Sequence, residues 1–480
     1  MDRKQEWILA PTTEYRFELD PDTSLAVKLL HGDAEVFGAE LAVNVIYLFG
    51  QECKAAIYTW EGCTIEMSQP STEYVSDETP MGVYANVHTA FEQMRVRALR
   101  KLRGSPVPDY ERDRPTDPPR VLVVGPENSG KTTLCKILTN YAVRTNQGWS
   151  PLLVNLDPSE GGWAAPGAIG AAPIHTPIPT NTPASPLGTA ASSAPSALSS
   201  NALLPLAYWY GHSEIKRNPL LVERIIRNLG DSVKDKIQAN PQGKGATAGF
   251  IVDTPSSFAA GNNDERQRMI RATIDAFQIN TILVVGHEKL NVELQRAYAS
   301  QLAVVKVPKS GGVVELDHLY RERVHKFQLH TYFYGQVIPP PPGLPAAALI
   351  GSETLSTSVL APSSTIINFD DLAIFRIGAE SMAPSSALPI GAARAVSETQ
   401  AVPIDPSAPG SGLLNAVLAV LAPRADAEHA YDEEILDLPI SGFIVVTNLD
   451  IPHRKMTILS PNQGSVVGRT AVIGSYEWQE

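Results

Sequence analysis

The sequence contains little cysteine. Three of its 480 residues are cysteines, Cys53, Cys63 and Cys135, and their odd number and wide spacing fit neither a disulfide framework nor a zinc site. Chains without disulfides are typical of reducing compartments. We therefore expect a protein of the cytosol or the nucleus.

Excess positive charge and long apolar segments are also missing. Lysine and arginine number 39 against 51 aspartates and glutamates, which gives a formal net charge of −12. A chain of this charge has no overall positive field to attract nucleic acid, although a local basic groove remains possible. Residues 1–6 lack the apolar core of a signal peptide. The longest apolar run near the C-terminus, about 413–422, is too short to cross a bilayer. We expect a soluble intracellular protein that contacts no membrane.

One motif organises what the sequence does contain. Gly125 to Thr132 fits the pattern G-x-x-x-x-G-K-[ST]. The β-branched run Arg120 to Val124 before it is typical of a buried strand, and apolar residues recur after it at helical spacing. A strand, a glycine-rich turn and a helix point successive backbone N–H groups at one phosphate group. A surface turn ahead of a helix is the alternative. We expect a nucleoside triphosphate site.

Each part of this phosphate loop has an expected task. The two glycines permit the turn and the close approach of the backbone, the lysine reaches the β- and γ-phosphates, and the hydroxyl of Thr132 is a ligand of Mg²⁺. The predicted nucleotide-binding residues of the loop are Gly125, Asn128, Ser129, Gly130, Lys131, Thr132 and Thr133.

Two aspartates complete the predicted metal site. Asp157 follows the apolar run 151–156, and Asp253 follows the apolar run 250–252. An acidic side chain at the end of a neighbouring strand commonly holds Mg²⁺ or its water shell. The alternative role for each is a helix N-cap. We expect both aspartates near the phosphates, and the sequence leaves open which one is the main magnesium partner.

Composition divides the chain into three domains. Residues 1–104 contain short strand patterns between Gly and Asp turns, which predicts a small β-sandwich. The sandwich is followed by a helical pattern from Val87 to Leu102, whose arginines form either a solvated face or a nucleic-acid contact. Residues 105–119 are rich in proline and charge and are a predicted linker.

The remaining chain predicts an α/β fold. Residues 120–335 alternate strand and helix patterns, which favours a central phosphate-loop domain with a parallel, doubly wound sheet. Within them, about 170–204 are mostly Ala, Ser, Thr and Pro, so we expect a disordered insertion. Residues 336–480 return to β patterns between loops of biased composition. The central domain is thus flanked by an N-terminal β-sandwich and a small C-terminal β-containing domain.

Further motifs resemble one family in the same order along the chain. They are Ala34 to Leu41, Thr59 to Cys63, Thr79 to Met81 with Asn86 and His88, Asn155 to Pro158, Val252 to Pro255, Pro308 to Gly312 and Tyr332 to Gly335. With the phosphate loop, they resemble the polynucleotide 5′-hydroxyl kinase family. Within it, the chain is similar to the phosphate-loop subunit of the pre-mRNA cleavage and polyadenylation factor, fungal type. The resemblance covers most of the chain outside the biased insertions.

The resemblance implies ligands and partners. It implies ATP and Mg²⁺, held between the N-terminal and central domains, with an acidic residue and a lysine of the sandwich near the purine. The matching positions are Glu14 and Lys54, for which two exposed strand charges are the alternative. The implied partner is the scaffold subunit of the cleavage and polyadenylation factor in the nucleus, and pre-mRNA is reached through that complex.

The chain departs from active kinases of the family at three places. Active members have a tryptophan-bearing clasp after the second aspartate, whereas residues 254–260 contain no tryptophan. They have arginines in a lid helix, for which residues 288–296 offer Arg296 and Lys289. They also have a glycine–glutamine turn where this chain has Pro158 to Gly161.

These departures favour a nucleotide-binding subunit over an enzyme. We predict an ATP-binding subunit that pre-mRNA cleavage requires and that has no catalytic residues of its own. The alternative is an active ATP-dependent polyribonucleotide 5′-hydroxyl kinase. A GTP-driven switch would need an Asn-Lys-x-Asp motif, which the sequence lacks.

Overall fold

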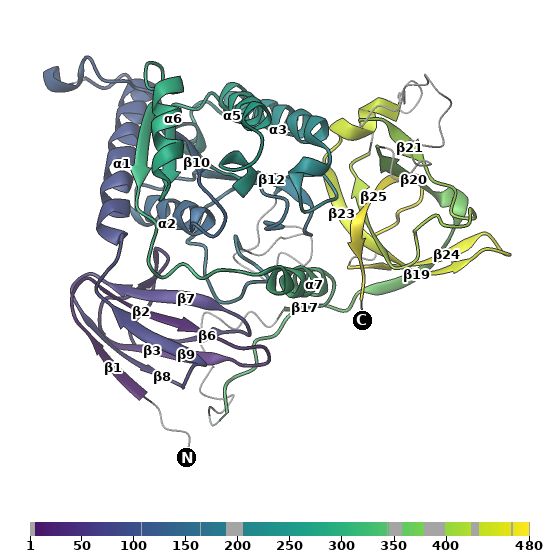
Figure 1. Ribbon diagram of the computed structural model, residues 1–480, viewed down its shortest axis with the longest axis horizontal. Helices are drawn as coiled ribbons and strands as arrows, with labels where there is room; N and C mark the ends of the chain where they lie inside the picture. The colour runs from purple at the N-terminus through teal and green to yellow at the C-terminus, as the bar shows by residue number, and fades with distance from the viewer. Residues whose placement is uncertain are drawn as a thin grey trace.

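Three domains are arranged around a central sheet in the computed structural model (Figure 1). The structure describes residues 5–106, 108–163, 165–188, 205–342, 344, 358–378, 399–423, 432–461 and 464–479. The N-terminal domain lies below the central domain in this view, and the C-terminal domain lies to its right.

The N-terminal domain consists of two antiparallel sheets packed face to face. Their strand orders are β1-β8-β3-β6 and β5-β4-β7-β2-β9. The strands are β1 (Gln5–Leu9), β2 (Thr13–Glu18), β3 (Leu25–Gly32), β4 (Glu35–Val36), β5 (Ala39–Glu40), β6 (Ile46–Phe49), β7 (Lys54–Thr59), β8 (Cys63–Met67) and β9 (Thr72–Ser76). Alternate residues point into a shared core, where Tyr15, Phe17 and Ile65 are buried. The predicted sandwich is confirmed.

The helix after the sandwich packs against the central domain. Helix α1 (Met81–Arg103) begins six residues before the predicted start, and its buried Tyr84 and Phe91 share a core with central strands. Arg95 is 1% exposed, and its Nε donates to the carbonyl oxygen of Ala248 at 2.9 Å. This arginine therefore belongs neither to a solvated face nor to a nucleic-acid contact, the two alternatives that the sequence suggested.

The central domain is a seven-stranded sheet with helices on both faces. Its order is β13-β12-β11-β14-β10-β15-β16. Five neighbouring strands are parallel: β10 (Arg120–Val124), β11 (Leu152–Asn155), β14 (Phe250–Asp253), β15 (Thr281–Val285) and β16 (Ala303–Val307). The helices of the domain are α2 (Lys131–Arg144), α3 (Pro219–Ala239), α4 (Lys244–Ala248), α5 (Asn263–Phe277) and α6 (Glu288–Tyr298). The predicted parallel, doubly wound arrangement is confirmed.

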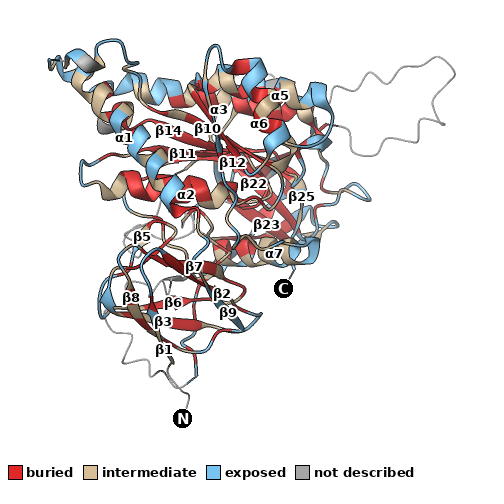
Figure 2. Ribbon diagram, turned by 60° about the vertical axis from the view of Figure 1, so that its left-hand side comes forward, coloured by how far each residue is buried: buried red, intermediate tan, exposed pale blue. Residues whose placement is uncertain are grey.

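Alternation along β10 shows how both faces of this sheet are buried. Leu122 and Val124 pack in the core formed with α3, α5 and α6. Val121 and Val123 pack in the core formed with α1 and α2. All four are fully buried, as is usual for the middle strand of a parallel sheet. In Figure 2 the strands are red, whereas the helices are pale blue on their outer sides.

Much of the segment predicted to be a disordered insertion is structured. Strands β12 (Ala168–Pro173) and β13 (Leu206–Trp209) extend the sheet in antiparallel pairing. Residues 174–188 then pack along the domain, with Ile178 and Leu187 buried. The prediction of disorder is wrong for 170–188. Small residues can form an ordered segment through backbone hydrogen bonds where the neighbouring sheet supplies the apolar surface. Residues 189–204 lie outside the described part of the chain.

The C-terminal domain is a seven-stranded sheet preceded by one helix. The order is β19-β24-β23-β22-β25-β20-β21. The strands are β19 (Ser363–Asn368), β20 (Leu372–Ile377), β21 (Ala401–Pro403), β22 (Ala416–Leu421), β23 (Ile440–Asp450), β24 (Lys455–Ser460) and β25 (Arg469–Glu477), with a separate pair β17 (Gly335–Gln336) and β18 (Ser358–Val359). The predicted C-terminal β domain is confirmed, and the biased residues 379–398 lie outside the described part.

Helix α7 (His318–Tyr334) lies where the three domains meet (Figure 1). Its second half shares an apolar core with the C-terminal sheet. The hydroxyl of Tyr320 donates to the carbonyl oxygen of Glu52 in the sandwich at 3.2 Å. Within the described residues, no helix combines the length and apolar character that crossing a bilayer requires.

Candidate nucleotide-binding site

The predicted phosphate loop joins β10 to α2. Asn128 and Gly130 both have positive φ angles, 50° and 84°, and the glycine directly precedes the helix. A Cβ atom at Gly125 would lie 2.8 Å from the Ser129 Oγ, so only glycine fits there. The Ser129 hydroxyl in turn donates to the carbonyl oxygen of Pro126 at 2.8 Å. The loop is therefore a formed cradle at a helix N-terminus, the geometry that binds phosphate.

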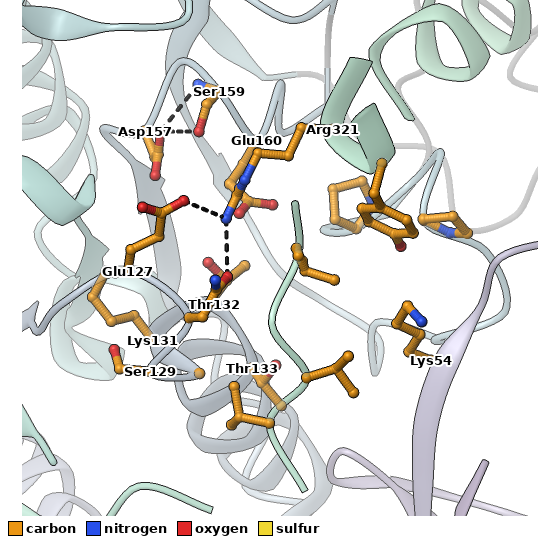
Figure 3. Close-up of a pocket in the computed structure, with 18 of the residues that line it drawn as sticks. Lys54, Glu127, Ser129, Lys131, Thr132, Thr133, Asp157, Ser159, Glu160 and Arg321 are labelled. Carbon is orange, nitrogen blue, oxygen red and sulfur yellow. Dashed lines mark hydrogen bonds and ion pairs between the residues drawn. The ribbon is translucent and has the colours of Figure 1, made fainter. Parts of the chain in front are cut away.

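The next residues point into the same cavity (Figure 3). Lys131 is 8% exposed, and its ammonium donates to the carbonyl oxygen of Pro126 at 3.1 Å. The Thr132 hydroxyl donates to Oδ2 of Asp253 at 2.6 Å. Thr133 also lines the cavity. Lys131 thus has no anionic hydrogen-bond partner in the described structure, and a phosphate group would supply one.

Asp253 has the features of a magnesium partner. It is 1% exposed at the end of β14, and its Oδ1 is buried without a hydrogen-bond partner among the described residues. Burial raises its pKa to about 6, while Lys131 and the Thr132 hydroxyl oppose that rise. A cation beside the orphaned oxygen would satisfy it. The donors therefore fit Mg²⁺, which takes few protein oxygens and completes its shell with phosphate oxygens and water.

Asp157 lies on the same side of the cavity, with one oxygen already engaged. Its Oδ1 accepts hydrogen bonds from the backbone N–H of Ser159 at 3.0 Å and from the Ser159 hydroxyl at 2.6 Å (Figure 3). Nowhere in the described ranges do three His, Cys, Asp or Glu side chains cluster as a metal site. An ion here would depend on the nucleotide for most of its ligands.

Glu160 is a site residue that the sequence did not single out. It follows β11 and lines the cavity between Asp157 and Arg321 (Figure 3). Burial, with Asp157 and Asp253 nearby, raises its pKa to about 7. The three carboxyl groups give this end of the cavity a concentration of negative charge that a divalent cation would neutralise. In the sequence, the only indication of a role for Glu160 is its position three residues after Asp157.

Arg321 is the second residue that the sequence did not indicate. From the first turn of α7, its Nη2 donates to Asn128 Oδ1 and to Glu127 Oε1, each at 3.0 Å (Figure 3). The lid candidates Arg296 and Lys289 are exposed on α6 and do not line the cavity. Their assignment was wrong, because the helix that crosses above the loop is the next one along the chain. The sequence feature that indicates Arg321 is its place among the basic residues that begin a helix after Gly311 and Gly312.

The sandwich forms the opposite wall. Glu14 is 4% exposed and accepts a hydrogen bond from Arg16 Nε at 2.7 Å and one from the Thr79 hydroxyl. Lys54 forms an ion pair with Glu18, and its ammonium lies 5.6 Å from the centre of the Tyr320 ring. Both predicted base contacts line the cavity, so neither is simply an exposed strand charge. They lie four positions apart in register, about 13 Å of strand.

The cavity that these walls enclose is large. Its volume is about 1160 Å³, above the usual range for a drug-sized ligand. The C-terminal domain contributes Ser475, Tyr476 and Glu477 to the wall. All the predicted site residues except Gly125 and Asp253 line the cavity directly. Gly125 leaves room for the Ser129 side chain, and Asp253 accepts a hydrogen bond from Thr132; both Ser129 and Thr132 line the cavity.

Comparison with known proteins places these features in one family. The family described as mRNA cleavage and polyadenylation factor CLP1 P-loop matches residues 125–335. The N-terminal beta-sandwich domain of polyadenylation factor matches residues 8–98, and the pre-mRNA cleavage complex II protein Clp1 matches residues 360–480.

Individual relatives match along nearly the whole chain. The mRNA cleavage and polyadenylation factor CLP1 of Laccaria bicolor is 69% identical over 481 residues, 99% of this chain and 98% of that protein. The CLP1 homolog of Anopheles gambiae is 34% identical over 460 residues, 95% of this chain and 93% of that protein.

Two solved Clp1p–Pcf11p structures share the fold. Each has a TM-score of 0.78 at 23% identity and covers 100% of this chain; this chain covers 99% of one of them and 100% of the other. The second of them addresses the structural basis of ATP loss in a point mutant. From its match to all three family descriptions and its identity to relatives of similar length, the chain belongs to the CLP1 family of mRNA cleavage and polyadenylation factors.

Proposed function

We propose that this protein is the ATP-binding subunit of the nuclear pre-mRNA 3′-end cleavage and polyadenylation machinery. In this role it is required for endonucleolytic cleavage before polyadenylation, and it carries out no phosphoryl transfer itself. The observation that carries the proposal is the complete phosphate loop with its Thr132–Asp253 pair, facing a cavity that all three domains line. ATP with Mg²⁺ in this cavity would contact all three domains and hold them together.

The direction of ATP in the cavity follows from the charges on its two walls. The triphosphate would lie on the loop and on the N-terminus of α2, with Mg²⁺ between Thr132 and Asp253. The adenine would lie against the sandwich, where the Glu14 carboxylate would accept from its exocyclic amine and Lys54 would donate to a ring nitrogen. Figure 3 shows Lys54 on the far side of the cavity from Lys131.

Two departures from active kinases support the absence of turnover. The loop that follows Asp253, residues 254–260, contributes Pro255, Ser256, Ser257 and Ala260 to the cavity but no aromatic ring that could hold an RNA end. The turn Pro158 to Gly161 also replaces the glycine–glutamine turn of active members. An acceptor hydroxyl that is not held in line with the γ-phosphate reacts slowly even when ATP is bound.

Two observations favour the second candidate, an ATP-dependent RNA 5′-hydroxyl kinase. Arg321 lies above the phosphate loop, where an arginine can neutralise charge on a transferring phosphoryl group. The cavity volume of about 1160 Å³ also leaves room for an acceptor beside a nucleotide. The lid is therefore not depleted, contrary to the expectation from residues 288–296.

A labelled-phosphate transfer assay separates the two candidates. The purified protein is incubated with γ-labelled ATP, Mg²⁺ and RNA that carries a 5′-hydroxyl, with the Lys131→Ala variant as the blank. We expect the wild type and the variant to give the same background. Transfer by the wild type that the variant lacks would establish the kinase instead.

The proposed partner is the scaffold subunit of the cleavage and polyadenylation factor. The solved structures that share this fold contain Clp1p bound to Pcf11p, and the relatives carry the name of the same machinery. Pre-mRNA would be reached through this complex, which places the protein in the nucleus. Co-precipitation of the tagged chain with its own species' scaffold subunit tests the partner directly.

A further inference from the structure

A second lysine of α2 lines the nucleotide cavity. Lys136 lies five residues after Lys131 and is 5% exposed. It lies outside the phosphate-loop motif, which therefore predicts no function for it.

Among the described residues, the hydrogen-bond partners of the Lys136 ammonium are neutral. It donates to the Thr180 hydroxyl at 2.8 Å and to the carbonyl oxygen of Pro179 at 3.4 Å. Within the described ranges, no carboxylate lies within ion-pair distance of it. Burial lowers its pKa to about 8, and Cys53 and Glu160 oppose that shift. Since a buried ammonium is stable only beside an anion or several strong acceptors, this one is poised to accept an anion.

The neutral partners belong to residues 174–188, here called the strap. The strap is held from two sides. Asn140 of α2 exchanges hydrogen bonds with Ile178 at 2.7 and 3.1 Å, and Gly50 of the sandwich donates its N–H to the carbonyl oxygen of Asn181 at 2.7 Å. Thr180 is therefore fixed at the cavity wall, and the amine can leave it without moving the strap.

Lys136 lies between the two ends of the proposed nucleotide position. It is one helical turn beyond Thr133, which lines the cavity beside the phosphate loop. On the sandwich side, the Lys136 ammonium is close enough to Cys53, the neighbour of Lys54, to oppose the burial that raises the pKa of that thiol. A nucleotide that reached from the loop to the sandwich would pass this amine, and its α-phosphate would be the phosphate group nearest to the sandwich.

We propose that Lys136 is a second phosphate-binding lysine, which exchanges Thr180 for the α-phosphate when a nucleotide binds. This inference rests on the proposed function, because it requires ATP to lie between the loop and the sandwich. No covalent bond changes: the amine exchanges a neutral hydroxyl for an anionic oxygen, so the hydrogen bond gains the attraction between opposite charges.

The test compares ligands that differ in their phosphates. Affinities for ATP, ADP, AMP and adenosine are measured by calorimetry, or by competition where binding is weak. We expect Lys136→Met to weaken ATP, ADP and AMP by one common factor, about tenfold to a hundredfold, and to leave adenosine unchanged. Lys131→Met should weaken ATP and ADP more than AMP. The control is Lys289→Met, which removes an exposed lysine of α6 that does not line the cavity.

A second variant keeps the inference testable if Lys136→Met does not fold. Thr180→Val removes the neutral partner and leaves the ammonium, so it should bind nucleotides at least as tightly as the wild type. Weaker nucleotide binding by Thr180→Val would overturn the inference. So would Lys136→Met with wild-type affinity, or with an equal loss for adenosine. If the wild type bound no ATP, the proposed function would fail as well.

Discussion

At the level of single residues, the site holds polar groups that the protein itself leaves unsatisfied. In the part of the chain that the structure describes, Oδ1 of Asp253 is buried without a hydrogen bond, and Lys131 donates only to the carbonyl oxygen of Pro126. Buried polar groups in this condition are uncommon in native proteins and destabilise the fold. Both groups would be satisfied by one ligand, a magnesium-bound triphosphate. The unsatisfied groups lower the stability of the protein without ligand, and binding of the nucleotide would remove this destabilisation.

Phosphate-loop substitutions test this directly. Lys131→Ala and Thr132→Ala should each weaken binding of ATP with Mg²⁺ by about 1.5–3 kcal/mol, since each removes a charge-assisted contact. Thr132→Ser keeps the hydroxyl and should retain most of the Mg²⁺ dependence. Calorimetry and the nucleotide content of the purified protein provide the measurement. Unchanged nucleotide content in Lys131→Ala would contradict the site.

A test of base recognition needs substitutions that leave the other contacts of each residue in place. Glu14→Gln is preferable to alanine, because alanine would remove the hydrogen-bond acceptor that Glu14 offers to the Nε of the buried Arg16. Glu14→Gln and Lys54→Ala should each lower the affinity for ATP by about 1–3 kcal/mol and reduce discrimination against GTP. Lys28→Ala, on β3 outside the cavity lining, is the control. Equal affinities of the wild type for ATP and GTP would exclude a base-reading sandwich.

We expect the contact of His88 on α1 with Tyr141 on α2 to make the stability of the protein sensitive to acid. Its ring lies 5.4 Å from that of Tyr141, and burial, with Arg95 and Arg144 nearby, lowers its pKa to about 4. The unfolded chain, with a pKa near 6.5, binds a proton between these values that the folded chain does not. The free energy of unfolding should therefore fall as pH drops from about 6.5 to 4, by at most about 1.4 kcal/mol per pH unit. In denaturant titrations the wild type should lose stability relative to His88→Phe as pH falls through this window, and parallel curves would contradict the assignment.

At the level of elements, α7 connects the site to all three domains. Tyr320 contacts the sandwich, Arg321 contacts the phosphate loop, and the hydroxyl of Tyr332 accepts the N–H of Phe443 in the C-terminal sheet at 3.1 Å. One helix therefore receives a contact from each of the three domains. A change at the phosphates can shift the whole helix, because packed elements move as units.

Arg321 allows the role of α7 to be measured. Arg321→Ala should weaken ATP binding by about tenfold and weaken AMP binding less, because the arginine lies above the loop where the outer phosphates bind. Arg296→Ala is the matched control, since it removes an exposed arginine of α6 that does not line the cavity. Calorimetry with both nucleotides provides the comparison. The same loss in both variants would mean that overall charge, rather than position, matters.

The sequence predicts elements whose signals are local. Strand β10, the phosphate loop and α2 follow from a β-branched run, two glycines and helical spacing within 25 residues. Strand β12 has no such signal, because its small residues become a strand only against the edge of β11. Residues 174–188 are likewise ordered by Asn140 and Gly50, which lie far away in the sequence.

The same distinction separates the site residues. The loop residues and Asp253 are predictable, because a motif or a strand end fixes their places. Arg321 and Lys136 are not, since their roles depend on where α7 crosses the loop and where the strap passes α2. The error over Arg296 and Lys289 has the same origin: a basic helix at a suitable position in the sequence does not face the cavity unless the fold directs it there.

At the level of the whole molecule, the cavity is the place where three domains meet. A ligand that binds only the folded state stabilises it by RT ln(1 + [L]/Kd), about 4 kcal/mol at a thousandfold excess over Kd. In this chain the ligand would contact the sandwich, the central domain and α7 together. Its binding energy would therefore fix the relative orientation of the domains, and with it any partner surface that spans them.

The last prediction is that ATP binding, stability and scaffold binding are lost together. With saturating ATP and Mg²⁺, Lys131→Ala should melt several degrees below the wild type, and without nucleotide it should melt no lower than the wild type, because the lost stability is that contributed by the ligand. The affinity of Lys131→Ala for the scaffold subunit should fall in the same samples, whereas Arg296→Ala should match the wild type in every assay. Differential scanning fluorimetry and a pull-down titration provide the two readouts, and ATP hydrolysis should stay at background throughout. Scaffold binding that persists in a variant unable to bind ATP would show that the docking surface does not depend on the nucleotide, and rapid hydrolysis by the wild type would show that ATP is consumed rather than held.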